Sequence, residues 1–123
     1  MKILVVDDEI SVCQTITGML SQLGHTSCSV TSADQALTQC AEEAFDLIIT
    51  DLGMPGINGL ELAQRVRAHL PQARIILVTG WPVQLDAEQL SEYGVECVIK
   101  KPLTLEALRT ALAGHSSVEE TKS

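Results

Sequence analysis

The sequence predicts an α/β fold in which helices cover both faces of a parallel, five-stranded sheet. The first observation is a set of short runs rich in Ile, Leu and Val that do not alternate with polar residues, as is typical of strands buried on both faces. These runs are residues 3–6, 47–49, 75–78 and 95–99. The second observation is that helical patterns lie between the runs, so that strand and helix alternate. Such alternation favours right-handed crossovers and a doubly wound sheet.

A more polar segment, residues 26–30, is the candidate for a fifth strand at an edge of the sheet. The first two helices have clear start or stop signals. Gly24 ends the first, which carries apolar residues three and four positions apart. Ser32, three residues before Gln35, resembles a capping box for the second.

The remaining helices are defined mainly by their ends. Asn58 is the expected N-cap of the third helix, and Pro71 stops it. A short helix over residues 84–92 has few apolar residues, so we expect it to be the least firmly packed element. Thr104 caps the last helix. We therefore predict one domain over residues 1–113, followed by a flexible polar tail over residues 114–123, which show no periodicity.

Composition excludes several classes of protein. Apolar residues make up 46% of the 123 residues, which is too many for a disordered chain. The net charge is −8 and the basic residues are scattered, which disfavours direct binding to nucleic acid or to anionic membranes. The N-terminal apolar run is too short for a signal peptide, and no run approaches the roughly 20 apolar residues of a spanning helix. We expect a soluble, cytoplasmic protein.

The chain has four cysteines, but none form a CxxC pair and no histidine lies at metal-ligand spacing. We expect reduced, half-buried thiols that act as small hydrophobic side chains.

Charged and hydroxyl side chains follow the buried runs, where the chemistry of an open α/β sheet is located. The first run ends in Asp7 and Asp8, the third strand in Asp51, the fourth in Thr79 and the fifth in Lys101. Because the carboxyl ends of parallel strands meet at one edge, we expect these groups to converge. Three close carboxylates repel one another unless a cation neutralises them, and Mg²⁺ is the hard cation that suits such oxygen ligands.

A carboxylate beside Mg²⁺ can attack phosphorus and form an acyl phosphate. The charge on the phosphoryl oxygens then needs neutralising groups. Lys101 can supply a positive charge, and the hydroxyl of Thr79 can donate a hydrogen bond.

Four ordered segments, covering about residues 1 to 113, resemble the receiver domain of two-component response regulators. They are residues 3–9 (ILVVDDE), 51–59 (DLGMPGING), 77–80 (LVTG) and 101–103 (KPL). The resemblance implies a flavodoxin-like sheet with strand order 2-1-3-4-5 and a cis peptide bond before Pro102.

The resemblance also implies the roles of the site residues. Asp51 would be the phosphoacceptor, and Asp7, Asp8, Asp51 and the backbone carbonyl of Gly53 would hold Mg²⁺. Thr79 and Lys101 would contact the phosphoryl group. A sensor histidine kinase or a histidine phosphotransfer protein would donate the phosphoryl group. Only self-catalysed phosphotransfer and autodephosphorylation would be expected, with no turnover of a separate substrate.

The sequence departs from the family pattern at three positions. Val98 replaces the aromatic residue that usually lies three positions before the lysine, so we expect signalling through Thr79 and a shift of the loop at residues 80–83. Trp81, the one tryptophan, is either a half-exposed loop residue or a lid or docking anchor. Gly53 offers no side chain to orient or block an attacking water.

Two other functions compete with the phosphoacceptor switch. A Mg²⁺-dependent phosphatase with an aspartyl-phosphate intermediate would need a general acid where Gly53 lies. A phosphorylation-independent interaction module would not need the acids, the threonine and the lysine that this chain keeps. The sequence leaves open whether the chain acts alone or within a larger regulator or hybrid kinase. The downstream partner is also open, although the expected output face comprises the helix at 84–92, the fifth strand and the last helix.

Overall fold

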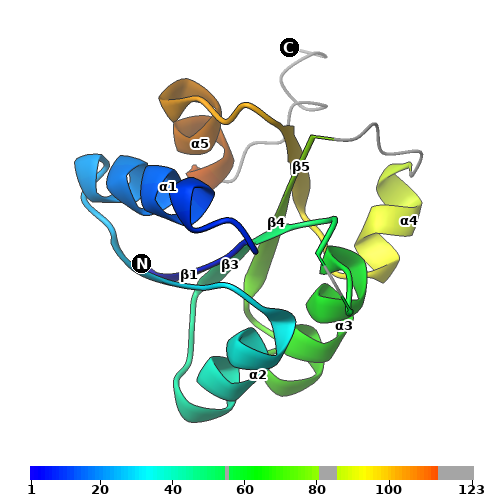
Figure 1. Cartoon of the computed structure of the whole chain (residues 1–123). Coiled ribbons are helices and arrows are strands. Elements are labelled where there is room, and N and C mark those ends of the chain that lie inside the picture. Colours follow the sequence, from blue (N-terminus) through cyan, green and yellow to red (C-terminus); the bar gives the residue numbers. More distant parts are fainter. Residues whose placement is uncertain (55, 81–85, 114–123) are drawn as a thin grey trace.

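The computed structural model describes residues 1–54, 56–80 and 86–113, in which strands and helices alternate along the chain (Figure 1). The strands are β1 Lys2–Val6, β2 Thr26–Val30, β3 Leu47–Asp51, β4 Arg74–Thr79 and β5 Cys97–Lys100. The helices are α1 Ile10–Gln22, α2 Ala33–Glu42, α3 Gly59–His69, α4 Ala87–Glu92 and α5 Leu105–Leu112. All strand pairs are parallel and the order is β2-β1-β3-β4-β5, which confirms the predicted fold class and strand order.

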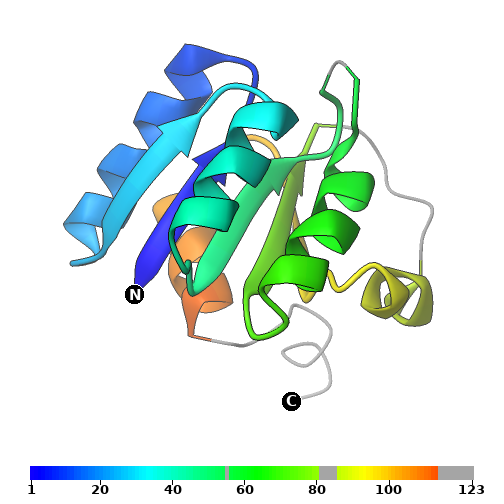
Figure 2. The ribbon, with the colours of Figure 1, turned by 90° about the horizontal axis from the view of Figure 1, so that it is seen from below.

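Helices cover both faces of the sheet, with α1 and α5 on one side and α2, α3 and α4 on the other (Figures 1 and 2). Alternate residues of each strand point to opposite faces and build two apolar cores. On β1, for example, Ile3 and Val5 join α1 and α5, whereas Leu4 and Val6 join α2 and α3. Burial of these aliphatic side chains is the main force that holds the layers together.

The apolar runs form the central strands as predicted, and all five residues of β3 are buried. Strand β2 lies at the edge and is partly exposed, which confirms the interpretation of its polar residues. The predicted start of the last strand at Val95 is wrong, since β5 begins at Cys97. The Val95 side chain is instead buried in the core on the face of the sheet that α2, α3 and α4 cover, and its N–H donates to the carbonyl of Leu90 at 2.9 Å.

The predicted N-caps of α2, α3 and α5 are confirmed by side-chain hydrogen bonds. The oxygens of Ser32, Asn58 and Thr104 each accept from a backbone N–H three residues later, at 3.0–3.1 Å. The fourth helix begins later than predicted, at Ala87. Asp86 forms a reciprocal capping box with Gln89, which fixes the start of α4 at this position.

The structure also bears on the cysteines and on the question of a membrane-spanning helix. None of the four cysteines, which all lie in the described part of the chain, forms a disulfide, and their burial varies: Cys13 and Cys40 are buried, Cys97 is partly buried and Cys28 is exposed. Within the described ranges, no helix has the length and apolar character needed to cross a membrane. Trp81, most of the loop at 80–83, and the tail at 114–123 lie outside the described residues, so the expectations for them stay predictions.

Candidate functional site

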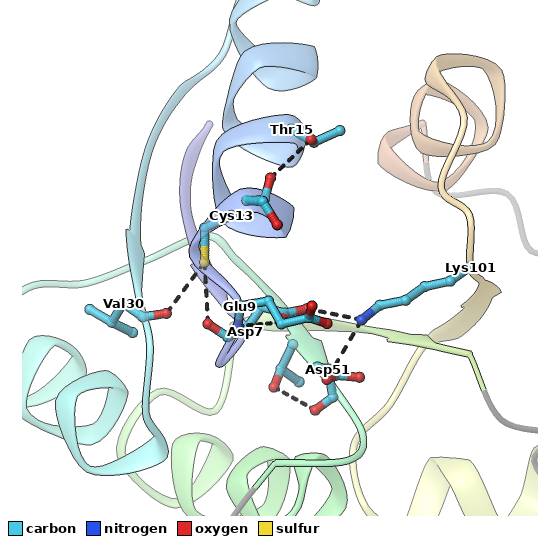
Figure 3. Close-up of polar contacts among 9 residues, drawn as sticks. Asp7, Glu9, Cys13, Thr15, Val30, Asp51 and Lys101 are labelled. Carbon is cyan, nitrogen blue, oxygen red and sulfur yellow. Dashed lines mark hydrogen bonds and ion pairs between the residues drawn. The ribbon is translucent and has the colours of Figure 1, made fainter.

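Three carboxylates meet at the carboxyl edge of the sheet. Asp7 and Asp8 follow β1, Asp51 is the last residue of β3, and these two strands pair with Val6 opposite Thr50. One carboxylate oxygen from each acid lies within 4.8 Å of those from the other two. Figure 3 shows Asp7 and Asp51 facing each other from neighbouring strands. The predicted convergence of the acids is therefore confirmed.

The acids differ in burial. Asp7 is 1% exposed and Asp51 is 7% exposed, whereas Asp8 lies at the surface. Burial, and next the negative charge of Asp7, raise the pKa of Asp51 above its ordinary value. Lys101 and a backbone hydrogen bond from Gly53 lower this pKa but do not outweigh the other effects. Ionised Asp51 is thus held at a net electrostatic cost, which a further cation would relieve.

Lys101 places its ammonium group between two of the acids (Figure 3). Its Nζ lies 3.1 Å from Oδ2 of Asp7 and 3.6 Å from Oδ2 of Asp51. Partial burial lowers the pKa of Lys101, but the hydrogen bond to Asp7 and the charges of Asp7 and Asp51 outweigh burial and raise it. The side chain is therefore a fixed positive charge at the site.

The backbone after β5 holds Lys101 beside β4. The N–H of Lys101 donates to the carbonyl of Thr79 at 2.8 Å, and the predicted cis peptide bond between Lys101 and Pro102 is present.

Backbone and side-chain hydrogen bonds fix Asp7 on every side. Its N–H donates to the carbonyl of Val30 on β2 at 3.2 Å. Its Oδ1 accepts from the N–H of Glu9 at 2.9 Å, and its backbone carbonyl accepts from the thiol of Cys13 at 3.3 Å. With Lys101 on Oδ2, the carboxylate has one defined orientation.

Gly59, the first residue of α3, packs against the backbone of Asp51. A Cβ at position 59 would lie 2.4 Å from the carbonyl oxygen of Asp51 and 2.8 Å from Cδ1 of Leu77. The N–H of Gly59 also donates to the carbonyl of Leu52 at 2.9 Å. The segment after β3 can therefore return this closely to Asp51 only with glycine at position 59.

The acids open into a depression of about 400 Å³. Its lining residues are Asp8, Glu9, Asp51, Gly53, Gly80 and Lys101. A Cβ at Gly80 would meet nothing within 4 Å, so this rim is open. The depression can admit a hydrated ion together with a small anion, since one water occupies about 30 Å³.

The donor set fits a hard divalent cation such as Mg²⁺. Magnesium binds oxygen at about 2.1 Å, so neighbouring ligands of one octahedron are about 3.0 Å apart and opposite ligands about 4.2 Å apart. One carboxylate oxygen from each of Asp7, Asp8 and Asp51 lies within 4.8 Å of the other two, so these oxygens must draw closer together to bind one ion. An ion there would keep coordination positions for water, because the site is a depression at the surface and not an enclosed cavity.

The remaining site residues predicted from the sequence lie at the same edge. Thr79 ends β4 and is buried, and Gly53 lines the depression. Three further residues at the site, Gly59, Gly80 and Cys13, were not predicted as site residues from the sequence. The sequence does offer an indication for Gly59, which follows the N-cap Asn58 and ends the motif of residues 51–59. The sequence offers no indication of the role of Cys13, because its two contacts, the carbonyls of Asp7 and Val30, are distant from each other in the chain.

Comparisons with known proteins agree with this geometry. The family model of the response regulator receiver domain matches residues 3–113. The response regulator protein FleR of Pseudomonas aeruginosa is 31% identical over 115 residues, which are 94% of this chain and 24% of FleR. The virulence sensor protein BvgS of Bordetella bronchiseptica is 35% identical over 119 residues, which cover 91% of this chain and 10% of BvgS. The chain thus spans less than a quarter of each relative.

A solved structure supports the same assignment. It is a response regulator protein from Burkholderia pseudomallei with a phosphorylated aspartic acid, calcium ion and citrate. The two chains superpose with a TM-score of 0.84 at 27% identity, over 98% of this chain and 70% of the other. With its fold, its acidic pocket and a family match over nearly its whole length, this chain belongs to the response regulator receiver domains of two-component signalling.

Proposed function

We propose that this chain is a signalling switch that accepts a phosphoryl group on Asp51 in a Mg²⁺-dependent reaction. The observation that carries the proposal is the meeting of the carboxylates of Asp7, Asp8 and Asp51 within 4.8 Å, with the ammonium of Lys101 beside them. The phosphorylated aspartic acid in the Burkholderia pseudomallei structure supports this chemistry.

The proposed reaction is a direct displacement at phosphorus. A carboxylate oxygen of Asp51 forms the new O–P bond, and the N–P bond of a phosphohistidine breaks with its electron pair returning to the imidazole nitrogen. Mg²⁺, when bound, neutralises charge on the transferred group. Asp7, Asp8, Asp51 and the backbone carbonyl of Gly53 would hold the ion.

Lys101 would neutralise the second side of the phosphoryl group. Its Nζ is nearer to Asp7 than to Asp51 before reaction, at 3.1 Å against 3.6 Å. A cation bound to Asp7 would compete for that carboxylate and favour movement of Lys101 toward Asp51. Thr79, on the strand next to Asp51, would donate its hydroxyl to a phosphoryl oxygen.

The partners follow from the family. A sensor histidine kinase or a histidine phosphotransfer protein would supply the phosphohistidine, which agrees with the receiver-like segment of the sensor protein BvgS. We propose that the output surface is formed by α4, β5 and α5. Val98 is partly buried beside the core and carries no ring that could rotate, so the signal would pass through Thr79 and the loop that begins at Gly80.

The two competing functions have less support. A phosphatase would need a general acid at the rim, but the depression has glycines at positions 53 and 80. An interaction module without phosphorylation would not need three carboxylates gathered within 4.8 Å of one another beside the ammonium of Lys101.

The proposal is tested with phosphoramidate, a small phosphoryl donor with an N–P bond, and intact-mass spectrometry. The wild type and Asp34→Asn, which changes an exposed carboxylate on α2, should each gain one phosphoryl group when Mg²⁺ is present. Asp51→Asn in Mg²⁺, and the wild type in EDTA, should gain none. Equal phosphorylation of Asp51→Asn and the wild type would refute Asp51 as the acceptor.

A further inference from the structure

The thiol of Cys13 contacts the backbone carbonyls of Asp7 and Val30 and so links α1 to the ends of β1 and β2 (Figure 3). Cys13 is in the first turn of α1 and is 2% exposed. Its Sγ is 3.3 Å from the backbone carbonyl oxygen of Asp7 and 3.7 Å from that of Val30, at the end of β2. The same Val30 carbonyl accepts the N–H of Asp7 at 3.2 Å, so Asp7, Val30 and Cys13 form one closed set of contacts.

These contacts matter because the groups involved are buried. Asp7 is 1% exposed, and a buried carbonyl that loses its donor cannot recover the lost interaction from water. A cysteine thiol in buried surroundings stays protonated at neutral pH and can therefore act as a donor.

The position of the Asp7 backbone decides where its carboxylate lies. Oδ1 is held by the N–H of Glu9 and Oδ2 by Lys101, so a shift of the Asp7 carbonyl would move the carboxylate relative to Asp51. Loss of a residue that orients a metal ligand typically lowers metal affinity 10- to 100-fold. A thiol is a weak donor, so we expect an effect at or below the lower end of this range.

We infer that Cys13 is a positioning residue for the divalent-cation site, and that its thiol holds Asp7 where the ion binds. This inference rests on the proposed function, since it concerns the cation that phosphoryl transfer at Asp51 would use. It differs from a purely packing role, in which Cys13 would fill space beneath α1 and any small apolar side chain would leave cation affinity unchanged.

The test measures Mg²⁺ affinity by isothermal titration calorimetry in four proteins. Cys13→Ala, which removes the donor, should bind Mg²⁺ about 3- to 10-fold more weakly than the wild type. Cys13→Ser keeps a donor and should stay within about 2-fold. Cys40→Ala removes another buried thiol, 5% exposed, in the core on the α2 side of the sheet, and should bind as the wild type does.

A measurement on the wild type keeps the inference testable if Cys13→Ala does not fold. Mg²⁺ at about ten times its Kd should slow alkylation of Cys13 about 10-fold, if the local opening that exposes the thiol also releases the ion. Alkylation of Cys40 should slow less. No slowing at Cys13, or equal slowing at both cysteines, would contradict the inference.

The outcomes separate the inference from the proposed function. If Cys13→Ala binds Mg²⁺ as tightly as the wild type, while the wild type is phosphorylated on Asp51, only the positioning role is refuted. If the wild type binds Mg²⁺ with the expected dependence on Cys13 but never accepts a phosphoryl group, only the phosphoacceptor function is refuted. A wild type that binds no Mg²⁺ would refute both.

Discussion

Two charged clusters lie at opposite ends of the parallel strands, and the ratio of positive to negative charges differs between them. At the carboxyl edge, three carboxylates face the single ammonium of Lys101. At the other edge, Arg74 begins β4, and its Nε lies 2.9 and 3.0 Å from the two carboxylate oxygens of Glu96. Its terminal nitrogens also donate to the carbonyls of Ala111 and Leu112 at 2.8 and 3.1 Å, at the end of α5.

This difference distinguishes the cluster of Arg74 and Glu96, which stabilises the fold, from the cluster of acids around Lys101, which can bind a cation. The hydrogen bond with Glu96 raises the pKa of Arg74, so the charged form of this side chain is favoured in the folded protein. The pKa of Asp51 is raised because its charged form is disfavoured there. Arg74 therefore stabilises the fold as it stands, whereas the acid edge keeps an electrostatic cost that a divalent cation would relieve.

The largest expected effect concerns the crowded backbone at the acid edge. Gly59→Ala would force a Cβ against the carbonyl of Asp51, and we expect the free energy of unfolding to fall by about 3 kcal/mol. Mg²⁺ affinity should fall as well, because Asp51 must move. Urea unfolding and calorimetry would measure the two effects.

Gly18→Ala is the matched control for this substitution. A Cβ at Gly18, in the exposed middle of α1, meets nothing within 4 Å and should stabilise the protein by about 0.5–1 kcal/mol. If both alanine variants had the same stability, the argument from crowding at Gly59 would be wrong.

A smaller effect is expected at the opposite edge. Arg74→Met would remove the hydrogen bonds that Arg74 donates to Glu96 and to two helix-end carbonyls and should lower the free energy of unfolding by about 2 kcal/mol. Mg²⁺ affinity should not change. Arg109→Met, which removes an exposed partner of Glu106, should cost about 0.5 kcal/mol or less. Weaker Mg²⁺ binding by Arg74→Met would show that the two clusters are coupled.

The smallest effect has the opposite sign. In EDTA at neutral pH, Asp51→Asn should raise the free energy of unfolding by about 1 kcal/mol, because it removes a buried charge beside Asp7. The control Asp34→Asn, in the exposed first turn of α2, should instead cost a few tenths of a kcal/mol by weakening the interaction with the helix dipole.

The pH dependence of this gain follows from the raised pKa of Asp51. The folded protein holds the proton of Asp51 more tightly than the unfolded chain, so stability falls as pH rises from the ordinary carboxyl pKa through the raised one. Below that window Asp51 is neutral in both states. The advantage of Asp51→Asn should therefore shrink in mildly acidic buffer, and an advantage independent of pH would argue against a charge effect.

Local patterns were enough to predict most of the fold and the centre of the site. Unbroken apolar runs indicated the central strands, and side-chain caps such as Ser32 and Asn58 indicated helix starts. The acids and Lys101 could be placed together because parallel strands end at one edge. Val95 misled the prediction of the last strand, because an apolar residue just before a strand and one within it look alike in sequence.

Roles that depend on tertiary contacts were not predictable. Cys13 reads as a small apolar residue of α1, and only the folded chain brings the carbonyls of Asp7 and Val30 to its thiol. Arg74 is likewise one scattered basic residue until Glu96 and the end of α5 meet it.

Sequential addition of Mg²⁺ and beryllofluoride to the wild type and Asp51→Asn tests the central claim most directly. Beryllofluoride mimics a phosphoryl group on a carboxylate, and the fluorescence of the single tryptophan, Trp81, can report its binding. The wild type should respond to beryllofluoride only when Mg²⁺ is present, and Asp51→Asn should not respond. An identical response in both proteins, or a wild-type response that persists in EDTA, would contradict a phosphoacceptor at Asp51 that depends on a cation held by Asp7 and Asp8.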